Sequence, residues 1–191
     1  MIIHCSSHEL PNYEETGYWR ALPQMVPSVT FNTRVQIAHK YQWLDVNTWD
    51  LFAGKRVLMF SLPGAFTPTC STYQLPEFEE LAPEFEELGI DGIICVTVND
   101  AFVCNAWARE NKLQNIVVVP DGNGDFTEAM QMLVDKNNLG FGRRSWRYAC
   151  VVENGTIEQW FIEEGKEDCC KTDPYMYTKP SYILEQLRGG N

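Results

Sequence analysis

Residues 57–70 read VLMFSL-PGAFTPTC, and this stretch predicts a buried strand that turns directly into a helix. The apolar run Val57–Leu62 has the composition of a buried strand, and the breaker Pro63-Gly64 ends it. Thr67 can then serve as the N-cap of a helix whose first residue is Pro68, which leaves Cys70 in the first turn. The unpaired N–H groups and the positive end of a helix favour a thiolate over a thiol. We therefore predict that Cys70 is chemically reactive.

A helix start could equally hold a small, inert buried cysteine, and the motifs around Cys70 decide between the two interpretations. Pro63, Thr67 and Cys70 match the P-x-x-x-T-x-x-C pattern of the peroxiredoxins, which are thiol peroxidases. The longer string PGAFTPTCS resembles their type-five branch. Three further matches follow in order: VNDAFV at 98–103, PDGNGDF at 120–126 and GFGRRSWRY at 140–148. Together they resemble the peroxiredoxin half of bacterial peroxiredoxin–glutaredoxin hybrid proteins, over about residues 26–187.

The order of predicted elements is that of an α/β protein. Strands alternate with helices through the middle of the chain, which implies parallel strands within the sheet. We predict a thioredoxin-like fold, a mixed sheet with helices on both faces and an N-terminal hairpin. The predicted strands are 28–31, 43–46, 56–62, 92–98, 116–119, 148–153 and 156–162, and the predicted helices are 48–54, one from Cys70 bent at Pro76 and Pro83, 101–110, 126–133 and 181–187. Asn154-Gly155 predicts a type I′ turn between the last two strands.

Size and charge bound the class of protein. A chain of 191 residues with 45% hydrophobic and 21% charged residues fits one globular domain. Its formal net charge of −11 argues against a nucleic-acid partner. No stretch reaches the roughly 20 apolar residues of a membrane span, and the N-terminus lacks the pattern of a signal peptide. We predict a cytoplasmic protein with an extension at residues 1–25 and a peroxiredoxin domain at residues 26–191.

Seven cysteines, an odd number without regular spacing, suit a reducing compartment. Cys95 and Cys150 lie in apolar runs and are predicted to be inert core residues, whereas Cys104 could lie in the core or at the surface. No C-x-x-C motif is present, which argues against a thioredoxin-type disulfide exchanger. His4, Cys5 and His8 could hold a metal, but no fourth ligand is in sight, so we predict no metal site.

Peroxide reduction needs a thiolate, a way to polarise the O–O bond and stabilisation of the leaving oxygen. The three histidines (4, 8 and 39) lie far from Cys70 in sequence, so activation is expected from the helix start, hydroxyl groups and a cation. The Thr67 hydroxyl is close enough in sequence to hydrogen-bond the thiolate or the peroxide, besides capping the helix. Pro63 either shields the thiolate from water or simply shapes the turn. By resemblance, Arg147 is the active-site arginine, and Arg143 and Arg144 serve packing or a subunit interface.

The oxidised Cys70 must be reduced again by a second thiol. Cys169-Cys170 lie in the polar stretch EEGKEDCCKTD, which predicts an exposed loop. Their distance beyond Arg147 is close to that of the resolving cysteine in two-cysteine type-five enzymes. The hybrid relatives are instead resolved by glutathione and glutaredoxin. Both routes remain open, and the hybrid-like motifs favour glutathione slightly over an intramolecular disulfide with Cys169 or Cys170.

The resemblance implies a thiol peroxidase that reduces hydrogen peroxide and organic hydroperoxides with no cofactor. Glutathione/glutaredoxin or thioredoxin would be its reductant. A homodimer is predicted through the face of the active-site loops, where Phe66, Phe141 and Trp146 would otherwise be exposed. The alternative is a peroxide sensor or redox-switched binding protein that uses the same cysteine, which would be oxidised once without turnover. The presence of Pro63, Thr67, Cys70 and Arg147 argues against an inactive paralogue.

Overall fold

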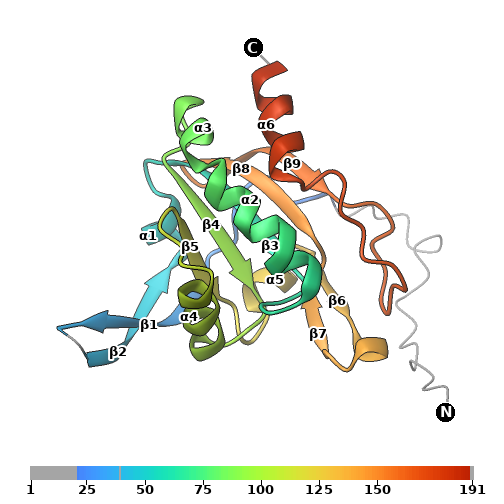
Figure 1. Ribbon diagram of the computed structural model, residues 1–191, viewed down its shortest axis with the longest axis horizontal. Helices are drawn as coiled ribbons and strands as arrows, with labels where there is room; N and C mark the ends of the chain where they lie inside the picture. Colours follow the sequence, from blue (N-terminus) through green and yellow to red (C-terminus); the bar gives the residue numbers. More distant parts are fainter. Residues whose placement is uncertain (1–20, 39, 190–191) are drawn as a thin grey trace.

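The protein is described by a computed structural model over residues 21–38 and 40–189, and it is built on one mixed sheet (Figure 1). The strand order is β5-β4-β3-β8-β9. β3 runs parallel to β4, and β4 runs parallel to β5, whereas β8 pairs antiparallel with both β3 and β9. The strands span Arg56–Leu62 (β3), Gly92–Thr97 (β4), Ile116–Pro120 (β5), Tyr148–Glu153 (β8) and Thr156–Ile162 (β9). The predicted mixed sheet is confirmed.

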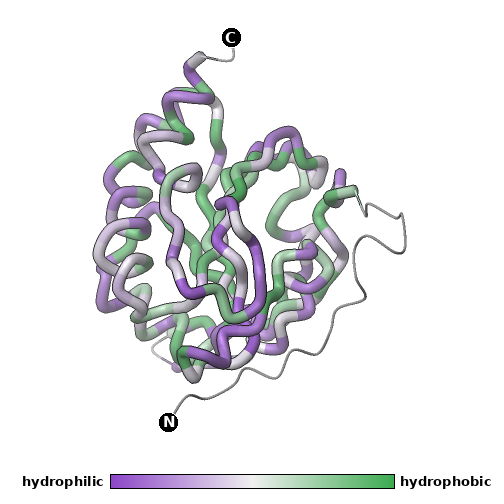
Figure 2. Tube along the Cα trace, turned by 90° about the vertical axis from the view of Figure 1, so that its right-hand side faces the viewer, coloured by the Kyte–Doolittle hydropathy of each residue, from purple (hydrophilic) through white to green (hydrophobic). Residues whose placement is uncertain are grey.

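Side chains alternate along the central strand and divide the core into two layers. Leu58 and Phe60 pack with α2, α3, α4 and α6, while Val57 and Met59 pack with α1, α5 and the N-terminal hairpin. The helices span Thr48–Phe52 (α1), Leu75–Glu80 (α2), Ala82–Glu87 (α3), Ala101–Glu110 (α4), Asp125–Ala129 (α5) and Pro180–Gly189 (α6). In Figure 2 the outer helices carry both hydrophilic and hydrophobic residues, as expected of elements that bury one face. Helices on both faces complete the predicted thioredoxin-like fold.

The N-terminal hairpin is also confirmed and is longer than predicted. β1 (Thr30–Ile37) pairs antiparallel with β2 (Lys40–Asn47) and projects from the body of the molecule (Figure 1). α1 follows at once, because the Asn47 side chain accepts from the Asp50 N–H in a capping box. The type I′ turn between β8 and β9 is likewise confirmed, with φ of 47° at Asn154 and 83° at Gly155.

The predicted helix over 126–133 is wrong at its C-terminal end. α5 stops at Ala129, where Gln131 takes a φ of 61° and the Met132 N–H bonds back to the Thr127 carbonyl. This Schellman-like closure ends the helix. Leu133 therefore starts a strand, β6 (Leu133–Asp135), which pairs with β7 (Arg143–Ser145) across a 3-10 turn at Asn137–Leu139. The helical spacing of Phe126, Met130 and Leu133 was misleading here, because the chain leaves the helix at Gln131, between the last two of these residues.

The predicted bend near Pro83 is present, since α2 ends at Glu80 and α3 begins at Ala82. The division at residue 25 stays a prediction, although the carbonyl of Gln24 and the N–H of Val26 already bond to β9 and its turn. Within the part of the chain that the structure describes, no helix is long and apolar enough to span a bilayer. The candidate metal ligands His4, Cys5 and His8 lie outside the described residues.

Candidate active site

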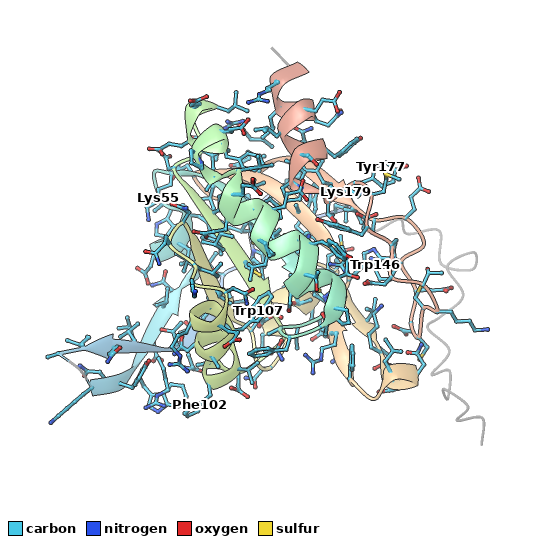
Figure 3. The ribbon with its side chains drawn as sticks, viewed as in Figure 1. Lys55, Phe102, Trp107, Trp146, Tyr177 and Lys179 are labelled. Carbon is cyan, nitrogen blue, oxygen red and sulfur yellow. The ribbon has the colours of Figure 1, made fainter. Side chains whose placement is uncertain are left out.

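Cys70 lies where β3 passes into its helix, beside the sheet. The segment Cys70–Gln74 is a π-helical turn that continues into α2. Pro76 has no N–H with which to continue α-helical bonding, and the N–H before it, that of Leu75, bonds to the Cys70 carbonyl. Trp107 of α4, which is labelled in Figure 3, ties this turn to the core, because its Nε1 donates to the Ser71 hydroxyl at 2.9 Å. The Cys70 side chain is 1% exposed.

Thr67 has a different hydrogen bond from the one predicted. Its hydroxyl donates to the Gly64 carbonyl at 2.7 Å, and its own carbonyl accepts from the Ser71 N–H at 3.0 Å. The prediction of a side-chain N-cap is therefore wrong, because the tight turn after Pro63 brings the Gly64 carbonyl within reach of the hydroxyl. Because the hydroxyl proton is donated to Gly64, the lone pairs of the Thr67 oxygen can still accept a hydrogen bond. The buried Pro63 forms the start of this turn.

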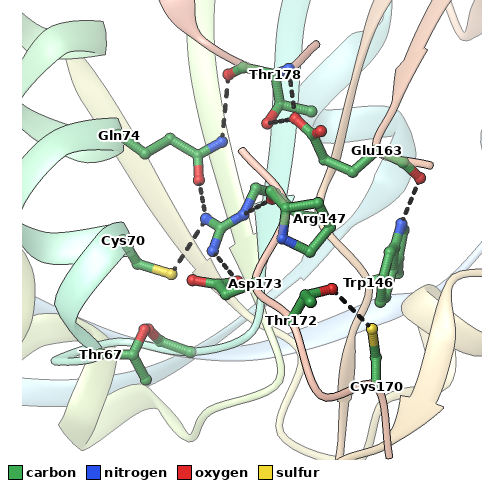
Figure 4. Close-up of polar contacts among 12 residues, drawn as sticks. Thr67, Cys70, Gln74, Trp146, Arg147, Glu163, Cys170, Thr172, Asp173 and Thr178 are labelled. Atoms are coloured by element: carbon green, nitrogen blue, oxygen red, sulfur yellow. Dashed lines mark hydrogen bonds and ion pairs between the residues drawn. The ribbon is translucent and has the colours of Figure 1, made fainter. Parts of the chain in front are cut away.

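Arg147 precedes β8 and directs its guanidinium at the thiol (Figure 4). Nη1 lies 3.4 Å from Cys70 Sγ and also donates to Gln74 Oε1. The other edge is held by Asp173, whose Oδ1 is 2.6 Å from Nη2, and by the Pro174 carbonyl, 3.1 Å from Nε. The Arg147 side chain is 2% exposed. The structure thus brings together the two residues that the sequence predicted as nucleophile and cation.

The charges around Arg147 keep it protonated. Burial by itself lowers the pKa of the guanidinium, but the negative charges of Cys70 and Asp173 outweigh burial and raise the pKa above its usual value. The Tyr175 ring covers the same group, with its centroid 5.4 Å from Cζ. Burial, followed by the nearby Glu77, raises the pKa of the Tyr175 hydroxyl well above its usual value, so the ring remains neutral. The site is therefore a buried cation beside a cysteine.

Sequence reasoning missed the residues that surround Arg147. Gln74 lies four residues after Cys70, on the same side of the helix, and this spacing could have indicated it. Asp173, Pro174 and Tyr175 carried no such signal, because they reach Arg147 from an irregular segment 26 residues or more beyond it.

The neighbouring arginines contact other groups. Arg144 donates from Nε to the Phe141 carbonyl at 3.0 Å and from Nη1 to the Val98 carbonyl at 3.1 Å. A Cβ at position 64 would lie 2.9 Å from the same Nη1, so the guanidinium of Arg144 would have to shift if Gly64 were replaced. Arg143 is exposed and pairs with Glu128 at 2.9 Å. Arg144 therefore supports the turn before Cys70, in keeping with the packing role expected of it.

The prediction of an exposed loop is wrong for Cys170. This side chain is 6% exposed and packs in the core layer on the α5 side, with its Sγ 3.4 Å from the Thr172 hydroxyl. The bend at Cys169, with a φ of 53° and its N–H bonded to the Asp135 carbonyl, turns the next side chain inward. Cys169 is not one of the free thiols. In Figure 4, Cys170 and Cys70 lie on opposite sides of Asp173.

Trp146 is a second correction, since it is buried rather than exposed in a loop. Its side chain is 1% exposed, and its Nε1 donates to the Glu163 carbonyl at 2.8 Å. Phe66, in contrast, is 54% exposed, and Phe141 is partly buried. The aromatic surface expected at the site is therefore carried by Phe66 and Phe141.

The remaining free thiols are core residues. Cys95 and Cys150 are fully buried, as predicted, and Cys104 is also buried. Burial raises the pKa of the Cys95 and Cys150 thiols, and burial followed by the charge of Asp100 raises that of Cys104 to about 12. These three thiols are therefore poor nucleophiles near neutral pH.

The chain is similar to known proteins in both sequence and fold. The family model described as Redoxin matches residues 31–178. The chain is 55% identical over 172 residues to "Peroxiredoxin" of Rhizobium etli, covering 87% of this chain and 96% of that one. It is 51% identical over 162 residues to "Hybrid peroxiredoxin hyPrx5" of Haemophilus influenzae, covering 85% of this chain and 64% of the relative. Among solved structures, the Plasmodium falciparum antioxidant protein (1-Cys peroxiredoxin) matches with a TM-score of 0.83 and 35% identity, covering 87% of this chain and 98% of that one.

One equivalent of hydrogen peroxide at pH 7 is expected to oxidise Cys70 and to leave Cys95, Cys104 and Cys150 as thiols. Peroxide oxidises the thiolate, and a pKa of about 12 leaves on the order of one Cys104 in 10⁵ deprotonated at pH 7. Each further unit of pH increases this fraction about tenfold, so Cys104 stays mostly protonated until the pH is close to about 12. The measurement is peptide mass spectrometry after trapping the sulfenic acid, with Cys70→Ser as control. Oxidation of Cys104 as fast as that of Cys70 would contradict the prediction.

Proposed function

Because this chain belongs to the redoxin family and is a peroxiredoxin, we propose that it reduces hydrogen peroxide and small organic hydroperoxides through Cys70. The observation that carries the assignment of residues is the contact of 3.4 Å between Arg147 Nη1 and Cys70 Sγ, inside a site where both side chains are buried. In this low-dielectric setting a fixed positive charge acts more strongly on a thiolate than it would in water.

The proposed reaction is a nucleophilic displacement on oxygen. The Cys70 thiolate attacks one peroxide oxygen, an S–O bond forms, and the O–O bond breaks. Cys70 becomes a sulfenic acid, and the other oxygen leaves as hydroxide or alkoxide, which takes a proton to give water or an alcohol. Cysteine sulfur is oxidised and the peroxide is reduced by the same two electrons.

Arg147 and Thr67 are proposed to hold the peroxide during this step. A guanidinium has five N–H donors, and the bonds from Arg147 to Cys70, Gln74, Asp173 and Pro174 occupy four of them. The fifth, on Nη2, has no partner in the part of the chain that the structure describes and is proposed to stabilise the oxygen that gains charge. The Thr67 oxygen, whose own proton goes to Gly64, can accept the O–H of the peroxide.

We propose glutathione, alone or with glutaredoxin, as the reductant, with thioredoxin as the alternative. Glutathione thiol would attack the Cys70 sulfenic acid, giving a mixed disulfide and water. A second thiol would then release the Cys70 thiolate and form an external disulfide. The burial of Cys170 and its contact with Thr172 support this route over an internal disulfide. The similarity to a hybrid peroxiredoxin and to a protein named a 1-Cys peroxiredoxin points the same way.

We also propose a homodimer through the face that carries the active-site turn. Phe66 is more than half exposed, and it lines one hollow together with Phe141, Arg144 and Thr67. Exposed aromatic surface beside a buried site is typical of an interaction surface. A partner there would cover Phe66 and help to keep bulk water from the Cys70 turn.

Arg147→Ala is expected to lower the rate constant for Cys70 oxidation by peroxide about a hundredfold, because one preorganised charge donor is lost. Arg144→Ala is expected to cost much less, since its donors go to the Val98 and Phe141 carbonyls. Stopped-flow measurement of the reaction with hydrogen peroxide compares the two variants. Equal losses would show that Arg147 has no special part in the reaction.

The resolving step is expected to yield a glutathione adduct on Cys70, with turnover retained in Cys170→Ser. Protein oxidised by one equivalent of peroxide, with and without glutathione, is to be analysed by mass spectrometry and tested for reductant-dependent turnover. A crosslink between Cys70 and Cys170 that forms quantitatively before any adduct would overturn the glutathione route. Stoichiometric oxidation without turnover on any thiol reductant would instead indicate a peroxide sensor.

Sedimentation velocity at micromolar concentration is expected to show a dimer for the wild type and a monomer for Phe66→Glu, because the new charge would be buried in the interface. Phe102→Glu is the matched control, since Phe102 is 56% exposed on α4, and it should leave the dimer intact. A monomeric wild type, or a Phe66→Glu protein that remains dimeric, would argue against this interface.

A further inference from the structure

We propose that Glu163 is a positioning residue for Arg147 and that it acts through residues 173–178, which we call the strap. The inference rests on the proposed role of Arg147 in peroxide reduction. Glu163 follows β9 and is 2% exposed, and no Lys or Arg side chain of the described residues pairs with its carboxylate. A buried carboxylate without a cation is costly unless hydrogen bonds satisfy it. Its partners therefore indicate what it holds in place.

Among the described residues, the donors to this carboxylate all come from the strap. Glu163 Oε1 accepts from the N–H of Met176, from the N–H of Thr178 and from the Thr178 hydroxyl, each at 2.8 Å (Figure 4 shows the two bonds from Thr178). Residues 173–178 form neither a helix nor a strand, so no backbone ladder of their own fixes their course. Hydrogen bonds to a charged acceptor are stronger than neutral ones. The Glu163 carboxylate therefore holds the C-terminal part of the strap, at Met176 and Thr178, in place.

The strap in turn holds the Arg147 guanidinium. Asp173 and the Pro174 carbonyl bond to Nη2 and Nε, and the Tyr175 ring covers the group. The Thr178 carbonyl accepts from Gln74 Nε2 at 3.5 Å, and Gln74 Oε1 accepts from Arg147 Nη1. Every contact described above for the guanidinium, other than that with Cys70, is thus made by the strap or by a residue bonded to it.

Glu163 also fixes the backbone that carries the arginine. Its N–H donates to the Arg147 carbonyl at 3.3 Å, and its carbonyl accepts from Trp146 Nε1 at 2.8 Å. Glu163 therefore acts on Arg147 in two ways. The main chain of Glu163 bonds to the main chain of Arg147, and the Glu163 carboxylate holds the strap, which contacts the Arg147 guanidinium. Loosening the strap would let the guanidinium sample other orientations, and small misplacements of a charge donor are costly in rate.

The test compares Glu163→Leu, Glu163→Gln and Glu164→Leu, each in the wild-type and the Arg147→Ala backgrounds. Leucine removes the acceptor, whereas glutamine keeps an oxygen where all three bonds converge. Glu164 is the adjacent, exposed control: it accepts from the Tyr177 hydroxyl of the strap at 3.3 Å, a solvent-exposed bond that contributes little. The readouts are the rate constant for Cys70 oxidation by hydrogen peroxide in a single turnover, which needs no reductant, and the melting temperature.

Glu163→Leu is expected to slow Cys70 oxidation about tenfold in the wild-type background and to leave it unchanged when Arg147 is already alanine. Glu163→Gln should remain within about threefold of the wild type, and Glu164→Leu should equal it. A role confined to stability would lower the melting temperature and change the rate equally in both backgrounds. That additive result, or an unchanged rate in Glu163→Leu, would overturn the proposal.

A Glu163→Leu protein that fails to fold is replaced by Thr178→Val, which removes only the hydroxyl bond. It should slow oxidation about threefold, the equivalent of one net hydrogen bond, and only where Arg147 is present. Equal losses in the two backgrounds would overturn the proposal. Failure of the proposed function has a different signature, because Cys70 of the wild type would then not react rapidly with peroxide, or Arg147→Ala would react as fast as the wild type.

Discussion

The structure depends on one buried contact, that between the Arg147 guanidinium and the Cys70 sulfur. Burying a guanidinium is costly unless acceptors replace the lost water. The surroundings of Arg147 meet this demand with an amide oxygen, a carboxylate and a main-chain carbonyl, all placed around the edge of a planar group. The irregular strap beyond β9 supplies two of the three. The path of the strap is therefore set in part by its bonds to the Arg147 guanidinium.

The sheet brings Cys70 and Arg147 to the same end of its central strands. β3 and β8 are antiparallel, and Ser61 near the end of β3 pairs with Tyr148 at the start of β8. The turn that leads to Cys70 and the residue that precedes β8 must therefore emerge side by side. Helices on both faces bury these strands and make this end a rigid support. Precise placement of a cation against a thiol needs such a support, since loops alone would leave both groups mobile.

The buried cysteines differ in the charged groups around them. Cys95, Cys104 and Cys150 are buried with no cation of the described residues bonded to them, and their raised pKa keeps them as thiols near neutral pH. Cys70 is just as buried, but it has Arg147 within hydrogen-bonding distance. All four side chains are buried, and the nearby positive charge of Arg147 distinguishes Cys70 from the others among the described residues. Under the function proposed above, selectivity among the thiols would come from electrostatics rather than from exposure.

The sequence by itself determined the features that depend on near neighbours. The apolar runs predict the strands, Asn154-Gly155 predicts the turn, and the motif after β3 together with the family resemblance predicts Cys70 and Arg147. Only the tertiary structure decided that Trp146 and Cys170 are buried and that a strap encloses the arginine. The physical reason is distance along the chain: Arg147 meets Cys70 across 77 residues and Gln74 across 73. Local propensity and periodicity carry no information about such contacts, which arise only once the sheet register and the packing of both layers are set.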